Sequence, residues 1–360
     1  MLDFTSALYL GLRHPAGSSR NWDALSLGQP AALQAPPGAA AVARELAALQ
    51  GTEAATLLPS TLHLFWDLFG LLAPRGSVVC VEAGTYAVAR WGIERAASCG
   101  AVVLEFEAGD MVALEGLVEV TAPARRRLLI ACDGLRPGSD TPTPLAAYAA
   151  LARRHGGCLV IDDTQALGVL GAGGGGSLRQ HGIKGAPVIV GASLAKGFGV
   201  PVAVLAGSQA LLRWFEARSQ TRLHSSPPSV AVIEAARYAL ALNRGCGDAL
   251  RARLRRRVRQ FRERLAALRV RCSGGDFPVQ SLTPLPGIDM AALHAALLQR
   301  RVRAVLHSDG TDAAARLSFV FTAAHSAACV ERAVCALAQA LDALRRSFRS
   351  ALQPPLAEAS

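Results

Sequence analysis

Short apolar segments alternate with longer helical patterns over the first two thirds of the chain. The apolar segments have the length of strands and are rich in β-branched residues, and they cover residues 77–81, 101–106, 127–132, 158–162, 187–190 and 202–206. Helical periodicity lies between them at residues 39–49, 60–72, 87–98 and 145–155. Buried strands separated by crossover helices predict a largely parallel sheet with helices on both faces. In such α/β sheets, ligands bind beyond the carboxyl ends of the strands.

The pattern changes after the Ser-Ser-Pro-Pro sequence at residues 225–228. Two long helices are predicted at residues 230–242 and 248–268, and they are followed by shorter elements: a strand at 279–283, a helix at 290–299, strands at 302–306 and 315–321, and a last helix at 327–348. This mixture is typical of a smaller α+β domain. We therefore expect a large cofactor-binding α/β domain over residues 1–230 and a small C-terminal domain over residues 231–360, and a length of 360 residues agrees with two lobes.

Positive charge is concentrated in the second of the two long helices. The chain has a formal net charge of +11, and eight arginines lie between residues 251 and 264. Leu254, Val258, Phe261 and Leu265 recur among them at steps of three and four, which is the apolar stripe of an amphipathic helix. A nucleic-acid-binding face is the alternative, but no recognition motif, zinc-ligand spacing or aromatic platform accompanies the arginines. We expect a solvated helix face and no nucleic-acid partner.

The cysteines and the hydropathy pattern exclude some classes of protein. The eight cysteines are scattered without a C-x-x-C pair, so we expect reduced, mostly buried thiols and no metal site. The first residues, MLDFTSALYLGL, lack the features of a signal peptide, and no stretch of about 18 uncharged apolar residues has the flanks of a membrane span. We expect a cytoplasmic protein without a membrane segment.

Asp162 and Asp163 stand side by side at the end of the strand predicted at residues 158–162. Adjacent carboxylates are unfavourable unless one of them faces a cation, so at least one is expected to meet a positive group. A helix cap or a metal ligand after the strand is the alternative.

Lys196 is one of only two lysines in the chain. It lies in a turn of small residues, 191–199, directly after a predicted strand. Apolar surroundings lower the pKa of a lysine and favour its neutral amine, the form that an imine-forming nucleophile needs. The alternative is a loop lysine that reaches into solvent, which suits Lys184 in its polar loop.

Together, Asp162 and Lys196 indicate pyridoxal 5′-phosphate (PLP). In this pairing the lysine carries the cofactor, and the carboxylate keeps the pyridine nitrogen protonated so that the ring can accept electrons. The cofactor phosphate then needs an anchor. Residues 57–62 open a helix, where exposed backbone N–H groups and the Ser60 hydroxyl suit a phosphate. Ser60 also fits the commoner role of a helix N-cap.

Five segments of the chain resemble blocks of one known family, the α-oxoamine synthases, which have PLP fold type I and include 8-amino-7-oxononanoate synthase and glycine C-acetyltransferase. The segments are residues 3–15, 45–60, 162–171, 193–199 and 321–325. The resemblance runs nearly from end to end, and the Asp162 and Lys196 blocks are its most specific parts. It implies the aspartate-aminotransferase fold, with a largely parallel central sheet and a smaller C-terminal α+β domain.

The resemblance also implies roles for individual residues. It makes Lys196 and Asp162 both catalytic and cofactor-binding, and no metal is implied. Tyr86 falls where the family has a histidine stacked on the cofactor ring, and Gln165 falls near the cofactor 3′-oxygen. The phosphate is assigned to Ser60, Thr61, Leu62 and Ser193, and across the interface of a homodimer with a shared active site to Ser225 and Ser226.

The implied reaction joins an amino-acid-derived carbanion to an acyl thioester carried on coenzyme A or on an acyl-carrier protein. The gravest departure from the family concerns the substrate carboxylate. The arginine that binds the substrate carboxylate should fall near Leu306 and His307, and neither is an arginine. Either Arg303 or Arg316 reaches in by another path, or the substrate is held otherwise. A PLP-dependent aminotransferase, or a decarboxylase or lyase of the same fold in a specialised pathway, is therefore the alternative.

Overall fold

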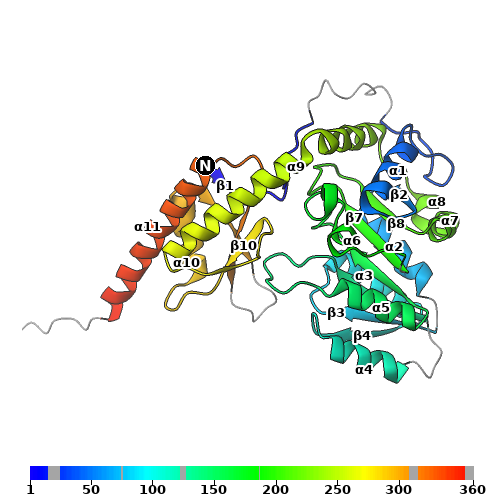
Figure 1. Ribbon diagram of the computed structural model, residues 1–360, viewed down its shortest axis with the longest axis horizontal. Helices are drawn as coiled ribbons and strands as arrows, with labels where there is room; N and C mark the ends of the chain where they lie inside the picture. Colours follow the sequence, from blue (N-terminus) through cyan, green and yellow to red (C-terminus); the bar gives the residue numbers. More distant parts are fainter. Residues whose placement is uncertain (15–24, 74–75, 122–126, 186, 308–314, 353–360) are drawn as a thin grey trace, which may run out of the picture. The chain divides into compact units, whose positions relative to one another are not determined.

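The computed structural model describes residues 1–14, 25–73, 76–121, 127–185, 187–307 and 315–352, with side chains described as far as residue 346. These residues form two compact units (Figure 1). The large unit contains residues 12–136 and 141–248. The small unit contains residues 1–11, 137–140 and 249–360.

A seven-stranded sheet forms the centre of the large unit. Its strands lie in the order β2-β8-β7-β6-β5-β3-β4, and their bounds are β2 Ala54–Leu58, β3 Ser77–Glu82, β4 Val102–Phe106, β5 Arg127–Asp133, β6 Cys158–Asp162, β7 Val188–Ser193 and β8 Ala203–Gly207. Strand β8 runs antiparallel to both of its neighbours, and the other pairs are parallel. The predicted fold class, a largely parallel α/β sheet, is confirmed.

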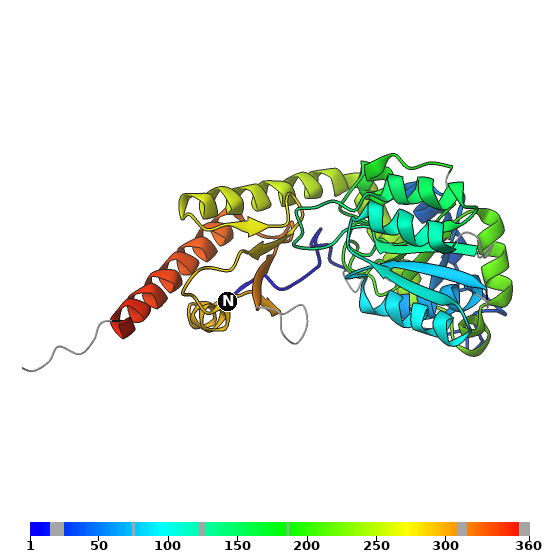
Figure 2. The same cartoon turned by 90° about the horizontal axis from the view of Figure 1, so that it is seen from below.

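Helices cover both faces of this sheet (Figure 2). Side chains that alternate along each strand separate into two apolar clusters, as expected for a sheet that is buried on both sides. One cluster packs against α2 (Thr61–Leu72), α3 (Ala87–Ser98) and α7 (Gln209–Arg218). The other packs against α4 (Met111–Thr121), α5 (Leu145–Arg154) and α6 (Ser177–His181).

The remaining helices of the large unit lie at its ends and connections. Helix α1 (Ala39–Gln50) precedes β2, η3 (Ala172–Gly174) precedes α6, and the five-residue α8 (Gln220–His224) follows α7. The predicted bounds of α3 and β6 are correct to the residue. No helix was predicted at α4, α7 or α8, because their apolar residues do not form a long periodic stripe.

The small unit is built on an antiparallel sheet in the order β12-β13-β10-β9. The strands are β9 Cys272–Ser273, β10 Val279–Leu282, β12 Val305–His307 and β13 Arg316–Val320, and a second, parallel pair joins β1 (Leu2–Asp3) to β11 (Val302–Arg303). Helices α10 (Met290–Gln299) and α11 (Ala327–Leu352) belong to the same unit. Phe4, Phe261, Phe319 and Phe321 are fully buried and contact one another edge to face or tilted.

Helix α9 corrects the prediction of two helices at residues 230–242 and 248–268. It is one helix, Val230–Ala267, that continues through Gly245 and Gly247. The boundary between the two compact units falls within this helix, between residues 248 and 249, and Met1–Gly11 belongs to the small unit. Packing in compact units does not test which segments fold on their own, so the domain boundary at residue 230 stays a prediction.

The arginine-rich part of α9 packs as the apolar stripe predicts. Leu254, Val258, Phe261 and Leu265 are buried, and several arginines bind polar partners within the small unit. The cysteines differ from the expectation. All eight are free thiols, but only Cys80 and Cys132 are buried.

Candidate active site

Four acidic side chains gather where neighbouring strands of the large sheet end. Glu82 ends β3, Asp133 ends β5, and Asp162 ends β6 with Asp163 directly after it. Asp133 and Asp162 are paired in the sheet register, and Asp162 in turn pairs with Gly191 of β7. Parallel strands end at the same edge of a sheet, so these groups meet at the edge where α/β proteins bind ligands.

Lys196 follows β7 in a tight turn at the same edge. The turn is closed by hydrogen bonds from the Leu194 N–H to the Val202 carbonyl (2.8 Å) and from the Phe198 N–H to the Leu194 carbonyl (3.1 Å). Gly197 is required there, because a Cβ would overlap the Leu167 carbonyl oxygen. Burial lowers the pKa of Lys196, and the negative charges of Asp162 and Asp133 oppose that shift. The predicted desolvation of this lysine is present.

Asp162 is a buried carboxylate at the end of β6. Its side chain is 6% exposed, and Oδ1 accepts a hydrogen bond from the Thr164 N–H (3.0 Å). Burial raises the pKa of Asp162, while the Thr164 hydrogen bonds and the Lys196 charge lower it. A further positive group at this site would therefore favour the ionised carboxylate, because it would offset the cost of burial.

Tyr86 faces Lys196 from the start of α3. The Lys196 Nζ lies 5.8 Å from the centroid of the Tyr86 ring, and the ring is largely exposed. The Tyr86 backbone N–H donates to Asp133 Oδ1 (3.2 Å), so this hydrogen bond joins the start of α3 to the end of β5. The structure thus brings Tyr86, Asp133, Asp162 and Lys196 into one neighbourhood.

Ser60 caps the N-terminus of α2, as its commoner role suggested. Its hydroxyl lies 2.8 Å from His63 Nδ1 and accepts a longer hydrogen bond from the His63 N–H (3.5 Å). Thr61 and Leu62 form the first turn, where helix N–H groups have no helical acceptor. Ser193 ends β7; its backbone N–H donates to the Thr164 hydroxyl, and its own hydroxyl accepts from the Ala195 N–H.

Gln165 is half-buried in the segment that follows Asp162 and Asp163.

Ser225 and Ser226, unlike the other predicted residues, lie at the end of helix α8. Ser225 is the C-cap of α8; its hydroxyl donates to the Thr221 carbonyl (2.6 Å), and its carbonyl accepts from the Ala31 N–H (2.9 Å). Ser226 is exposed. The hydrogen bonds of Ser225 therefore stay within its own segment and the loop at Ala31.

Three residues of this region were not predicted as site residues. Asp133 ends a strand next to that of Asp162, and burial together with the Asp162 charge raises its pKa to about 8. Asp163 is fully buried against the Ser177 N–H, and burial raises its pKa to about 7. Thr164 contacts both Asp162 and Ser193. The strand-end position of Asp133 was a signal available in the sequence.

His307 and Arg316 lie opposite each other in the small unit. They are a register pair of β12 and β13, so an arginine stands directly across from the position where the family arginine is missing. His307 Nε2 lies 2.8 Å from the Ser318 hydroxyl, which in turn lies 2.7 Å from the Ser281 hydroxyl. Arg303 ends β11 and is exposed.

The described residues contain neither a candidate membrane span nor a candidate metal site. None of the helices in these ranges combines the length and the apolar character that crossing a bilayer requires. Over the same ranges, no three His, Cys, Asp or Glu side chains are grouped so that they could hold a metal ion.

The chain is similar to known proteins over most of its length. A model of the family "aminotransferase class I and II" matches residues 1–337. The chain is 32% identical over 357 residues to 8-amino-7-oxononanoate synthase of Methylococcus capsulatus, covering 94% of this chain and 89% of that protein. It is 31% identical over 271 residues to the same enzyme of Dechloromonas aromatica, covering 74% of this chain and 69% of that protein.

A solved structure shows the same fold. Serine palmitoyltransferase of Sphingomonas wittichii matches with a TM-score of 0.86 at 17% sequence identity, over 96% of this chain and 88% of that chain.

Proposed function

Because the chain belongs to the class I and II aminotransferase family, we propose that it is a PLP-dependent transferase that joins an amino acid to an acyl group from a thioester. The observation that carries this proposal is the desolvated Lys196 beside two buried carboxylates at the ligand-binding edge of the sheet. When bound, PLP withdraws electrons from the substrate α-carbon.

The residues present fit PLP. Asp162 needs a positive partner to compensate for its burial, and a protonated pyridine nitrogen supplies one. Burial lowers the pKa of Lys196 and so favours the neutral amine that attacks an aldehyde, and the same amine can afterwards move the proton at the substrate α-carbon. Tyr86 offers an aromatic face toward Lys196. Gln165 follows Asp162 closely and can donate its amide N–H groups to the cofactor 3′-oxygen.

The phosphate would be held by the first turn of α2 and by the end of β7. Ser60, Thr61 and Leu62 combine a hydroxyl with the positive end of a twelve-residue helix. Ser193 adds a hydroxyl three residues before Lys196. The Ser60 hydroxyl is already engaged with His63, so a bound phosphate would compete with that contact.

A homodimer with a shared active site completes this proposal. Four large apolar side chains are 42–52% exposed on helices that pack against one another, namely Leu62 and Trp66 of α2, Trp91 of α3 and Leu223 of α8. Exposed aromatic and aliphatic groups on neighbouring elements mark protein interfaces. A second copy of the chain is the occupant that would bring Ser225 and Ser226 to the phosphate of the partner site.

The substrates are an amino acid and an acyl thioester on coenzyme A or an acyl-carrier protein. We place the reaction in the cytoplasm, and the eight free thiols support a reducing compartment.

An aminotransferase, or a decarboxylase or lyase of the same fold, is the second candidate function. It is favoured by one observation: neither Leu306 nor His307 supplies the arginine that the acyl-transferring relatives imply at this position.

One assay separates the two candidates. Purified protein is incubated with PLP, a panel of amino acids and an acyl-coenzyme A, and free coenzyme A is measured by chromatography, since exposed thiols such as Cys99 would react with a thiol reagent. We expect coenzyme A release that depends on the amino acid and is lost in Lys196→Ala. Lys184→Ala is the matched control, because it removes the only other lysine, which is exposed. Formation of pyridoxamine phosphate without an acyl donor would establish the aminotransferase instead.

A further inference from the structure

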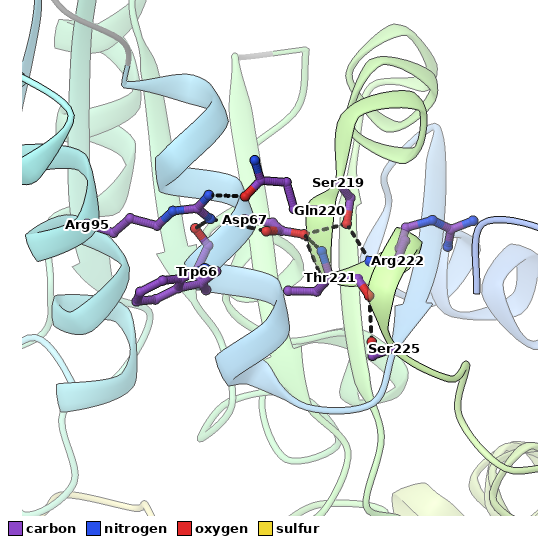
Figure 3. Close-up of polar contacts among 8 residues, drawn as sticks. All are labelled: Trp66, Asp67, Arg95, Ser219, Gln220, Thr221, Arg222 and Ser225. Carbon is purple, nitrogen blue, oxygen red and sulfur yellow. Dashed lines mark hydrogen bonds and ion pairs between the residues drawn. The ribbon is translucent and has the colours of Figure 1, made fainter. Parts of the chain in front are cut away.

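Asp67 is a buried acid in the middle of helix α2 (Figure 3). Its side chain is 1% exposed, and it is the only acidic residue in an otherwise apolar helix. Three of the donors to its carboxylate come from the segment that begins α8: the Ser219 hydroxyl (2.5 Å), the Thr221 N–H (2.8 Å) and the Thr221 hydroxyl (2.8 Å). The carboxylate thus joins two elements that are about 150 residues apart in the sequence.

Arg95 of α3 supplies the charge that offsets the burial of this carboxylate. Its Nη1 lies 3.2 Å from Asp67 Oδ1 and donates to the Trp66 carbonyl, while Nη2 donates to the Gln220 side chain (2.6 Å). Gly70 leaves the space that the guanidinium fills, because a Cβ there would meet Arg95. All four donors converge on one acid, so the network fixes α2, α3 and the start of α8 together.

The network leads directly to the proposed phosphate segment. Thr221 is bound by Asp67 through its N–H and hydroxyl, and its carbonyl accepts from both the N–H (2.9 Å) and the hydroxyl (2.6 Å) of Ser225. On the other side, the Ala31 N–H donates to the Ser225 carbonyl and the Ala32 N–H to the Arg222 carbonyl. Ser225 is therefore two hydrogen bonds away from Asp67, and the only residue between them is Thr221.

A purely structural role does not require this arrangement. A buried ionic network contributes little net stability compared with well-packed apolar residues of the same volume, but it selects one geometry. The N-terminus of α2, which carries Ser60, Thr61 and Leu62, lies about 9 Å along the helix from Asp67. The same rigid helix therefore connects the phosphate turn of its own site to the Ser225 segment.

We propose that Asp67 is a positioning residue for the cofactor phosphate of the partner subunit. It holds Ser225 and Ser226 in place on one protomer, and that segment completes the phosphate site of the other. This proposal rests on the proposed function, because it requires PLP on Lys196 and a homodimer.

The first test compares cofactor affinity in two matched variants. Asp67→Asn keeps the shape of the side chain but removes the negative charge that pairs with Arg95. Its amide NH2 group would also face groups that now donate hydrogen bonds to the carboxylate. We expect PLP to bind about tenfold more weakly, as for the loss of one charge-assisted contact. Glu105→Gln is the control, since it breaks the exposed ion pair with Arg90 and should leave the affinity unchanged. Affinity is measured by equilibrium dialysis.

The decisive test uses hybrid dimers made by co-expression with two affinity tags. One protomer carries Lys196→Ala and the other carries Asp67→Asn, so the only cofactor lysine lies in the Asp67→Asn protomer. If Asp67 acts on the partner site, that lysine is served by an intact Ser225 segment, and the affinity returns to the wild-type value. A loss of stability alone would not be rescued in this way.

Several outcomes would overturn the proposal: hybrid dimers that remain as weak as the Asp67→Asn homodimer, or an Asp67→Asn homodimer with wild-type affinity. If Asp67→Asn does not fold, Thr221→Val replaces it, since this variant keeps the backbone donor and loses only one hydroxyl. We expect a smaller fall in PLP affinity and the same rescue in the hybrid dimer. An unchanged affinity, or a fall without rescue, would refute the proposal. Borohydride labelling of wild-type Lys196 is measured first. Its failure would refute the proposed function and is distinguishable from failure of the positioning role.

Discussion

Asp162 ends β6, and Lys196 follows the neighbouring parallel strand β7. Burial shifts the pKa of each group and so affects which protonation state it adopts. We expect Asp162→Ala to retain PLP on Lys196 but to lose turnover by orders of magnitude, because the pyridine nitrogen would lose the carboxylate that keeps it protonated. The visible absorbance of bound cofactor and the rate of coenzyme A release measure the two effects separately. Near-normal turnover would assign this role to Asp133 or Asp163.

Asp133 should make the stability of the cofactor-free protein fall as the pH rises. Its folded-state pKa is about 8, and an unfolded aspartate titrates near about 4. Between these values the folded chain binds more protons than the unfolded chain, so the free energy of unfolding decreases with increasing pH.

Asp133→Asn removes this dependence. Relative to the wild type, the variant should gain on the order of 2 kcal/mol of stability between pH 5 and pH 8, since coupling with Asp162 spreads the titration. Denaturant unfolding at both pH values measures the difference. The exposed Glu119→Gln serves as control, and an Asp133→Asn difference that does not change with pH would contradict the burial of this acid.

The sequence was sufficient to predict which strand ends approach one another, because parallel strands that follow in sequence end at one edge. Asp162 was singled out as one of two adjacent carboxylates at a strand end, and Lys196 as one of only two lysines, in a turn of small residues. The sequence did not identify Asp133, because Cys132-Asp133-Gly134 also reads as a strand followed by an exposed turn, and the burial of the carboxylate depends on the neighbouring strands. Asp67 carried a signal that was missed, a lone acid within an apolar helix.

Helices α2 and α3 pack closely against each other at Gly92. A Cβ at this position would overlap the Phe65 carbonyl oxygen, so Gly92→Ala must push the two helices apart. We expect a loss of about 1–3 kcal/mol in the free energy of unfolding. Gly116→Ala is the control within α4, where nothing lies within 4 Å of the added carbon, and it should gain about 0.5–1 kcal/mol. Equal effects in the two variants would contradict this close packing.

Element bounds were predictable where apolar periodicity is strong, as in α3, β6 and α10. Helix α9 was predicted as two because Gly245 and Gly247 interrupt the pattern. Each glycine costs only about 1 kcal/mol within a helix, and buried residues on both sides of the interruption, such as Leu240 and Leu254, outweigh that cost. The direction of β8 was not predictable, because an apolar run of this length suits either orientation.

Formation of the proposed dimer decides whether the phosphate site is complete. Light scattering should give about twice the mass of one chain. The double substitution of Trp66 and Leu223 by glutamate should yield a monomer, because it places charge in the proposed apolar interface. Val112 of α4 is more exposed than Trp66 or Leu223, and the protein with Val112→Glu should remain a dimer. A wild-type monomer with full PLP occupancy would remove Ser225 and Ser226 from the site.

Borohydride reduction shows which residue carries the cofactor. Purified protein loaded with PLP is reduced with borohydride, digested and mapped by mass spectrometry. Only two lysines are available, Lys184 and Lys196. We predict visible absorbance before reduction and a phosphopyridoxyl label on the peptide that contains Lys196. A label on Lys184, or no label on either lysine, would contradict the assignment of the active site.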